Sequence, residues 1–289
     1  MAVAGSVMKR IQISGDTYYV PGITNVCLYQ DYMIDPSNNE NVDWDRPPKV
    51  KYALVSHMHT DHFWNGSKMR AAGARIYAPR SERSAIENTA VNTNGSFCWA
   101  EPPEGMRPWY FASVSCPVDG ALDELDMPLK AVPLPGHTQW QTGFLTPDNV
   151  LAAADAIVTK KVWDTKKIVY YTSPEDARRS LEYIRDCGAD YVVPSHCGLL
   201  SGEEAAELAE VNLKGIDMLE KTVMKVLGRE ERTTEEMVGG TGCALKIRDD
   251  FSMSIVVETT VRALLFMLSR QGRVRYELRG HKVYWQAVG

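Results

Sequence analysis

Short apolar and alternating segments, separated by turn residues, fill the beginning of the chain. They predict four strands, at residues 10–14, 17–20, 26–29 and 32–34. Glycine and proline pairs supply the turns between them. After a proline-containing loop, an apolar run at residues 50–55 predicts a buried strand. A pattern of helical period over residues 63–72 then predicts a helix that ends before Gly73.

The strand and turn pattern continues through the rest of the chain. It predicts strands at residues 75–77, 129–134, 141–146, 150–154 and 191–193. Ser81 is the predicted N-cap of a helix over 82–88, and Ser173 caps a helix that stops at Gly188. A capping box at Ser201 opens a long helix, with an apolar stripe formed by Leu208, Val211, Leu219, Val223 and Val226. Two strand-rich halves, each followed by helices, indicate an α/β fold (α+β in some schemes).

Residues 89–120 differ from the rest because they contain prolines and tryptophans but show no clear period. A long segment without a pattern inside a compact domain indicates a functional loop or lid. Its apolar side chains either line a pocket or simply pack the loop against the protein. The candidates are Met106, Trp109, Tyr110 and Phe111.

A dense group of metal-binding side chains lies between the predicted strand at 50–55 and the helix after it. Three of the six histidines and one aspartate fall within six residues, in the sequence His57-Met58-His59-Thr60-Asp61-His62. Imidazole nitrogens and carboxylate oxygens are ligands that suit zinc, and less selectively iron or manganese. The segment therefore predicts a metal site.

Three further side chains share the same context, because each follows a predicted apolar strand. They are His137, Asp155 and His196. Taken singly, each has an ordinary structural interpretation, since a histidine or aspartate at a strand end often serves as a hydrogen-bonded turn or cap residue. Together with the first group they supply seven ligands, which is the number that a two-metal site requires.

These motifs, in this order, resemble the metallo-β-lactamase superfamily of dinuclear hydrolases, over about residues 8 to 227. The resemblance implies a four-layer αβ/βα sandwich with the metal site at one edge. It assigns His57, His59 and His137 to the first metal, and Asp61, His62 and His196 to the second, with Asp155 between them. Two metals in such a site share a hydroxide that attacks the substrate at neutral pH. Asp61 is then the candidate catalytic residue that orients this nucleophile and moves its proton.

Within the superfamily, the first strands and the Asp35-Pro36 turn are most similar to the glyoxalase II-like branch. This resemblance implies that the substrate is a small thioester, ester or lactone. The basic residues with which that branch recognises glutathione carboxylates have no counterpart in this sequence. Cys197, directly after His196, also departs from the pattern, and we interpret it as a packed thiol rather than a ligand.

The composition changes after residue 227, and we predict two domains, at residues 1–227 and 228–289. The second contains a helix start at 233–237, a glycine-rich joint at 239–242, a helix over 255–270 and a hairpin at 274–285. This order resembles a small winged-helix module. Its basic residues form a nucleic-acid-binding wing, or else a solvated face or a packing module that shapes the active-site entrance, and we favour the latter two over the wing. They are Arg262, Arg270, Arg273, Arg275, Arg279 and Lys282.

Charge and cysteine content restrict the partners and the location. The net charge of −5 provides no overall attraction to nucleic acid or to an anionic membrane. No apolar run approaches the roughly 20 residues that span a bilayer, and the N-terminus lacks the order of a signal peptide. The six cysteines contain no CxxC pair. We therefore predict a cytoplasmic protein with a small-molecule substrate, in which a homo-oligomer is allowed.

The sequence thus favours a dinuclear metal-dependent hydrolase, with zinc as the first choice of metal, that cleaves a small thioester, ester or lactone. The first alternative is a metal-dependent phosphodiesterase or nuclease, which the basic tail would suit. The second alternative is a non-enzymatic nucleic-acid-binding regulator. A complete ligand set argues against this last hypothesis, because a domain that had lost its activity would be expected to lose ligands.

Overall fold

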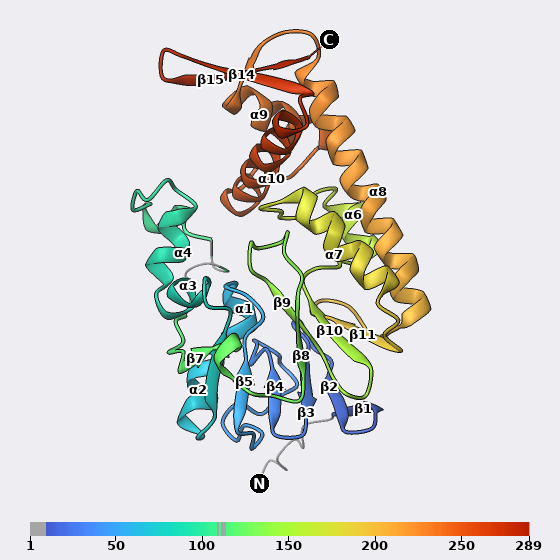
Figure 1. Ribbon diagram of the computed structural model, residues 1–289. Helices are drawn as coiled ribbons and strands as arrows, with labels where there is room; N and C mark the ends of the chain where they lie inside the picture. Colours follow the sequence, from blue (N-terminus) through green and yellow to red (C-terminus); the bar gives the residue numbers. More distant parts are fainter. Residues whose placement is uncertain (1–9, 109, 111–113, 289) are drawn as a thin grey trace, which may run out of the picture.

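The computed structural model describes residues 10–108, 110 and 114–288, and its core is a pair of β-sheets (Figure 1). The first sheet has seven strands in the order β1-β2-β3-β4-β5-β6-β7. Their bounds are Ile11–Ser14, Thr17–Val20, Val26–Tyr29, Tyr32–Ile34, Tyr52–Leu54, Arg75–Ala78 and Gly120–Ala121. Pairing is antiparallel from β1 to β4 and parallel from β4 to β7. The strands predicted in this region are present, with small differences at their ends.

The second sheet has five strands in the order β12-β11-β10-β9-β8. In chain order they are β8 Lys130–Pro133, β9 Thr142–Leu145, β10 Val150–Ala154, β11 Tyr191–Pro194 and β12 Leu200–Ser201. Only the β10–β11 pair is parallel, and the crossover between these two strands contains helices α6 (Lys160–Thr165) and α7 (Pro174–Asp186). Helix α6 was not predicted from the sequence.

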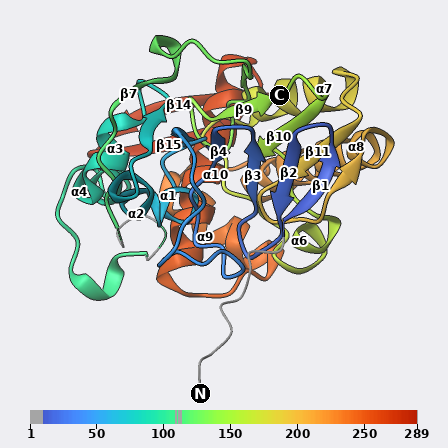
Figure 2. The ribbon, with the colours of Figure 1, turned by 90° about the horizontal axis from the view of Figure 1, so that it is seen from below.

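The two sheets pack face to face, and helices cover their outer faces. One apolar cluster joins Tyr29 and Leu54 of the first sheet to Phe144 and Ala152 of the second. A second cluster packs the first sheet under helices α1 to α3, and a third packs the second sheet under α7 and α8. Figure 2 shows α2, α3 and α4 at one side of the strands and α7 and α8 at the other. The result is a mixed α/β fold that agrees with the four-layer sandwich.

The two best-defined helix starts were predicted correctly. The Ser173 hydroxyl accepts a hydrogen bond from the Asp176 amide at the start of α7, and Gly188 follows the helix with φ +70°. Ser201 and Glu204 form the predicted capping box of α8 (Gly202–Leu227). All five residues of the predicted stripe of α8 belong to or pack against one hydrophobic cluster, and small and polar residues share the buried face with them. The buried residues of α8 are Ala205, Ala209, Asn212, Gly215, Ile216, Leu219, Val223 and Leu227.

The helix predicted over 63–72 is divided in two. Helix α1 (Thr60–Phe63) starts earlier than expected, and α2 (Gly66–Ala71) follows after a break. Asn65 causes the break, since its side-chain amide donates to the Ser37 carbonyl at 2.7 Å and its backbone leaves the helical region. Ser81 is not a cap, because α3 (Arg83–Glu87) begins after Glu82 and no side chain caps it.

Residues 89–120 contain more regular structure than their sequence indicated. Helix α4 (Thr89–Gly95) is capped by Asn88, whose side chain accepts from the Ala90 amide, and a short 3-10 helix covers Glu104–Met106. Met106 is half-buried. Of the aromatic candidates in this segment, Trp109 and Phe111 lie outside the described residues.

The C-terminal segment forms a three-stranded antiparallel sheet and two helices. Its elements are β13 Arg232–Thr233, α9 Thr234–Leu245, α10 Phe251–Arg270, β14 Val274–Arg279 and β15 Lys282–Ala287. The strand order is β13-β15-β14. The joint predicted at 239–242 is wrong, because these glycines lie inside α9. Gly240 permits close packing of α9 on α8, since a Cβ there would lie 2.8 Å from Cγ1 of Val226.

One hydrophobic cluster runs across residue 227. It joins Leu219 and Val223 of α8 to Met237 of α9 and to Val261 and Leu264 of α10. The C-terminal segment therefore shares its core with the second sheet and its helices, and the division into two domains stays a prediction. Figure 1 shows α10 placed between α4 and α8, above the ends of the strands.

Helix α10 differs from the expectation that no segment could span a bilayer. Its 20 residues are long and apolar enough by length and composition alone. Half of its apolar window (50%) is buried inside the protein, and the core helix of a soluble protein passes the same test. This is weak evidence for a membrane segment.

Candidate metal centre

The seven predicted ligands converge at one edge of the sandwich, where several strands end. His57 and His59 follow β5, and the turn after them starts α1, which carries Asp61 and His62. The remaining three follow strands of the second sheet: His137 after β8, Asp155 after β10 and His196 after β11. They form two groups, and within each group the candidate ligand atoms all lie within 4.8 Å of one another.

The first group consists of His57, His59, His137 and Asp155. His59 Nδ1 lies 3.1 Å from His57 Nε2 and 2.8 Å from His137 Nε2. His137 Nε2 lies 3.4 Å from Asp155 Oδ2. Three imidazole nitrogens and one carboxylate oxygen thus face a common point, which is the donor set of a four-coordinate zinc-type site.

The second group consists of Asp61, His62 and His196. Asp61 Oδ2 lies 3.6 Å from His62 Nε2 and 3.3 Å from His196 Nε2. Asp155 is close to this group as well, with Oδ1 3.5 Å from His62 Nε2 and Oδ2 3.4 Å from His196 Nε2. Its carboxylate therefore stands between the two groups, in the position where it could bridge two cations.

Two buried polar atoms in the cluster test whether metal ions fit. His62 Nε2 and Asp155 Oδ1 have no hydrogen-bond partner among the residues that the structure describes. Buried polar atoms are nearly always satisfied, so a pair left open at the same place calls for an explanation. A divalent cation would satisfy both, and the nitrogen and oxygen donors match its chemistry.

The opposite nitrogen of most of the histidine rings is fixed by a hydrogen bond, which orients the ring. His137 Nδ1 lies 3.0 Å from the Tyr170 carbonyl, and His196 Nδ1 lies 2.7 Å from the Ile23 carbonyl. Carbonyl oxygens only accept, so in both rings Nδ1 carries the proton and Nε2 is left free for a metal. Such contacts typically fix the tautomer of a ligand histidine.

Asp35 performs this role for His62, and sequence analysis missed it. Its Oδ2 lies 2.9 Å from His62 Nδ1, and its two oxygens also accept from the Ser56 amide and hydroxyl, each at 2.8 Å. Asp35 adopts φ +54°, a conformation that L residues other than Asn and Asp rarely take. The sequence showed only a turn here, because the contact to His62 exists only after β4 and β5 pair.

Glu82 is a second residue that sequence analysis missed. It is 1% exposed and accepts from the Met58 amide at 2.6 Å, the Thr138 hydroxyl at 2.5 Å and the Trp140 amide at 3.1 Å. Met58 lies between two ligands and Thr138 follows a third, so one carboxylate joins both ligand loops. Burial raises the pKa of Glu82 to about 7, although the three hydrogen bonds act to lower it.

The two groups differ in their protonation. Burial holds the pKa of His57 and of His59 well below the ordinary value, so both rings are neutral and ready to bind a metal. In the second group, burial acts to lower the pKa of His62 and His196, but the neighbouring aspartates outweigh it. The pKa of His62 is raised well above its usual value, and that of His196 rises to about 10. A cation entering the second group must therefore displace protons.

Cys197 lies outside both ligand groups. Its backbone carbonyl accepts from the Asn25 side chain at 2.5 Å, and burial raises the pKa of its thiol. These observations agree with the interpretation of a packed thiol, since a raised pKa disfavours the thiolate that binds metals.

Comparisons with known proteins agree with this geometry. The sequence profile of the metallo-beta-lactamase superfamily matches residues 44–196, a range that contains all seven predicted ligands. No curated protein sequence matches the chain.

Solved structures show the same fold. A metallo-beta-lactamase family protein from Thermus thermophilus is 18% identical, with a TM-score of 0.63 over 94% of this chain and 98% of its own. A beta-lactamase domain protein from Burkholderia ambifaria is 14% identical, with a TM-score of 0.67 over 99% of this chain and 95% of its own. Fold, ligand geometry and the profile match lead to one conclusion: the chain belongs to the metallo-beta-lactamase superfamily and is a metal-dependent hydrolase.

Proposed function

We propose that the protein binds two divalent metal ions, with zinc as the first choice, and hydrolyses a small thioester, ester or lactone. The observation that carries this proposal is the position of Asp155, whose carboxylate lies within 3.5 Å of His62 and 3.4 Å of both His137 and His196. A single carboxylate between two complete ligand groups is the arrangement expected of a dinuclear site.

Each ligand group would hold one cation. The first would be held by His57, His59 and His137, the second by Asp61, His62 and His196, with Asp155 shared between them. Bound cations of this kind polarise a carbonyl and lower the pKa of water, which makes hydrolysis fast at neutral pH.

The protein's own residues orient the reaction. Asp61 Oδ2 accepts a hydrogen bond from the Thr24 hydroxyl at 3.1 Å, which fixes its carboxylate beside His196. Although burial acts to raise it, the pKa of Asp61 is held well below its usual value by His62 and His196. An ionised carboxylate at this position can orient an attacking water and accept its proton. The side chain of His196 is 39% exposed, so the cluster reaches solvent on the side of the second group.

The choice of an acyl substrate rests on the resemblance of the N-terminal strands and the Asp35 turn to the glyoxalase II-like branch. The contacts of Asp35 with Ser56 and His62 support that resemblance, since they place this turn within the metal site. A test is hydrolysis of a panel of acyl thioesters, lactones and phosphodiesters by the zinc-loaded protein, with Asp61→Asn as the control. Hydrolysis of the acyl thioesters or lactones supports the proposal. If none of these acyl compounds is hydrolysed, the proposal is overturned.

The alternative of a phosphodiesterase or nuclease draws support from the C-terminal segment. The end of α8, then β13, α9, α10 and the β14–β15 hairpin, with the strand order β13-β15-β14, fits a winged-helix-like module. The basic residues of this module are largely engaged, however, since Arg270 pairs with Glu175, Arg273 with Glu220 and Arg279 with Glu231. Paired arginines offer little charge to a phosphate backbone. Cleavage of bis-p-nitrophenyl phosphate and RNA, with no cleavage of acyl compounds, would favour this alternative.

We do not propose the non-enzymatic regulator, because the ligand set is complete and its geometry is that of a hydrolase. The cytoplasmic location and the homo-oligomer stay predictions from the sequence.

A further inference from the structure

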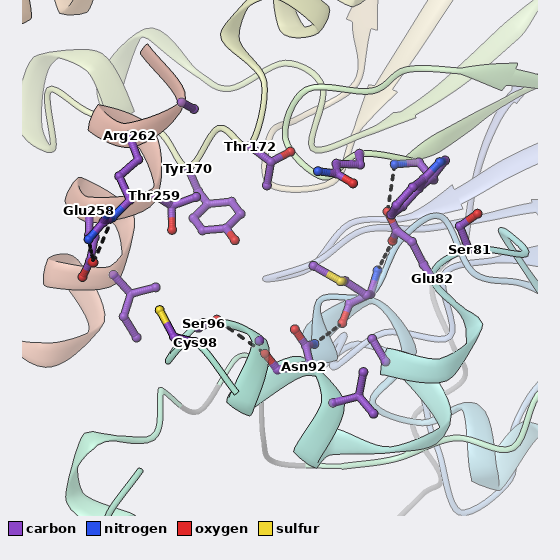
Figure 3. Close-up of a pocket in the computed structure, with 18 of the residues that line it drawn as sticks. Ser81, Glu82, Asn92, Ser96, Cys98, Tyr170, Thr172, Glu258, Thr259 and Arg262 are labelled. Carbon is purple, nitrogen blue, oxygen red and sulfur yellow. Dashed lines mark hydrogen bonds and ion pairs between the residues drawn. The ribbon is translucent and has the colours of Figure 1, made fainter. Parts of the chain in front are cut away.

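A cavity of about 630 Å³ is lined by Tyr170, whose ring lies close to His59 of the first group. Figure 3 shows the side chains that line it. Its walls come from residues 81–85 and 91–99, the loop of Gln139 and Trp140, and one face of α10, with Met58, Tyr170 and Thr172 between them. Small-molecule sites usually have volumes of about 300–1,000 Å³. The cavity is therefore of the right size for part of a substrate.

The cavity borders the ligands of the first group. Met58, which lies between His57 and His59 in the sequence, lines it, and so does Tyr170. The centre of the Tyr170 ring lies 5.3 Å from that of His59 and 5.6 Å from that of His137. Figure 3 shows the Tyr170 ring beside Thr259 of α10, with Asn92 and Ser96 below it. None of the seven candidate ligands lines the cavity, so Met58 and Tyr170 stand between this space and the first group.

The rim of the cavity carries exposed aromatic rings. Trp99 is 70% exposed, Trp140 is 51% exposed and Phe266 is 50% exposed. Trp99 has φ +67° and the preceding Cys98 has φ +54°, a strained conformation for residues other than glycine. Such strain concentrates at functional sites. Large rings that remain in water around a cavity indicate a surface for an apolar ligand.

The charged groups of the lining are already engaged. Among the described residues that line the cavity, the charged ones are Glu82, Glu258 and Arg262. Arg262 donates to Glu258 of the same helix at 2.8 and 3.1 Å. Glu82 accepts three hydrogen bonds from the ligand loops. No described lining residue therefore offers an unpaired cation to a carboxylate or phosphate.

We propose that this cavity binds the acyl part of the substrate and selects uncharged, hydrophobic acyl groups. The inference rests on the proposed function for the bond that is cleaved, but the binding itself does not require turnover. It also accounts for the lack of the basic residues that would recognise glutathione carboxylates. Helix α10 then contributes to specificity, because its residues Ile255, Ala263 and Phe266 line the cavity.

The first test is a series of N-acetylcysteamine thioesters with straight acyl chains from acetyl to decanoyl. With zinc-loaded protein we expect kcat/KM to rise about fourfold for each added CH₂ until the chain fills the cavity. Trp99→Ala and Trp140→Ala should lower kcat/KM for the decanoyl compound about tenfold, and change that for the acetyl compound less than about twofold. Both side chains are more than half exposed, so neither change should affect folding. Tyr276→Ala, which removes a 66% exposed ring outside the cavity lining, is the matched control.

The second test measures binding without turnover. The decyl thioether of N-acetylcysteamine has no hydrolysable bond, and its binding can be followed by calorimetry with or without metal. We expect binding with a negative heat-capacity change, weakened by both tryptophan variants and unchanged in the control. If the thioether binds but no thioester is hydrolysed, this inference is supported and the proposed function is refuted. If the acetyl thioester is cleaved but chain length has no effect and the thioether does not bind, the inference is wrong and the hydrolase proposal stands. An effect of chain length that is the same in the tryptophan variants as in the control also overturns it.

Discussion

The two ligand groups of the metal centre are built from the same residue types but differ in their surroundings. His57, His59 and His137 are between 0% and 8% exposed, and burial lowers the pKa of each. His62 and His196 face the two aspartates, which raise their pKa values. The first group is therefore prepared for a cation, whereas the second holds protons that a cation must displace. We expect the first metal to bind more tightly and with less dependence on pH.

Asp155 joins the two groups, so its removal should have the largest effect. Asp155→Asn keeps the shape of the side chain but removes the charge that both cations would share. Changes in residues that only support ligands cost about 10–100-fold, so we expect activity to fall by more than about 100-fold. Elemental analysis should find clearly less metal than in the unchanged protein. Asp164→Asn, on the surface of α6, is the control, and a variant with full metal content and activity would contradict the assignment.

Variants that remove one ligand from one group at a time test the difference in metal affinity between the two groups. His196→Ala should leave about one metal per chain, because the first group stays intact. His59→Ala should lower the affinity of the tighter site, and calorimetric titration with zinc resolves the two. Should His196→Ala abolish all metal binding while His59→Ala has no effect, the order of affinities is the reverse of the one we infer.

The pH dependence of stability differs between the metal-free and the metal-loaded protein. A histidine whose pKa is raised on folding stabilises the fold fully below its unfolded pKa, about 6.5, and this contribution is lost as pH rises through the folded pKa. For His196 that folded pKa is about 10. The melting temperature of the metal-free protein should therefore fall between about pH 6.5 and 10. The metal-loaded protein should lack this decline, because cations replace the protons, and parallel curves for both forms would refute the protonation difference.

Glu82 holds the ligand loops of the first group but is not itself a candidate ligand. Its replacement should therefore have the smallest effect of the four predictions. The two carboxylate oxygens of Glu82 accept hydrogen bonds from three donors. In Glu82→Gln one oxygen becomes an amide NH₂ group, which is itself a donor and would face at least one of these three donors. We expect metal affinity to fall by about 10–100-fold, with a larger effect on the first metal. Glu87→Gln, at the end of α3, which begins directly after Glu82, is the matched control, because Glu87 pairs with Arg83 and contacts no ligand loop. Equal affinities in both variants would show that Glu82 does not position the ligand loops.

The sequence indicated the candidate ligands but not Asp35 and Glu82, the two residues that position them, and the reason is physical. Each candidate ligand follows an apolar strand, and strand ends in a sandwich converge on one edge, so local patterns were enough to select seven candidates that lie together in the structure. Asp35 and Glu82 act through partners 21 to 58 positions away, which no local pattern reveals.

The ends of helices were also predicted well where local signals set them and poorly where packing set them. The capped helices α7 and α8 were predicted because their starts are local signals. The glycines at 239–242 indicated a joint, but the contact of Gly240 with α8 requires a small residue within a helix. In the same way, the hydrogen bond of Asn65 to Ser37 divided a helix that the pattern showed as continuous.

The most direct test of the central claim is an anomalous-diffraction measurement on crystals of the zinc-loaded protein. The account predicts two peaks about 3.5–4 Å apart, one beside each ligand group, with the Asp155 carboxylate between them. A single peak, or peaks away from these seven side chains, would contradict it.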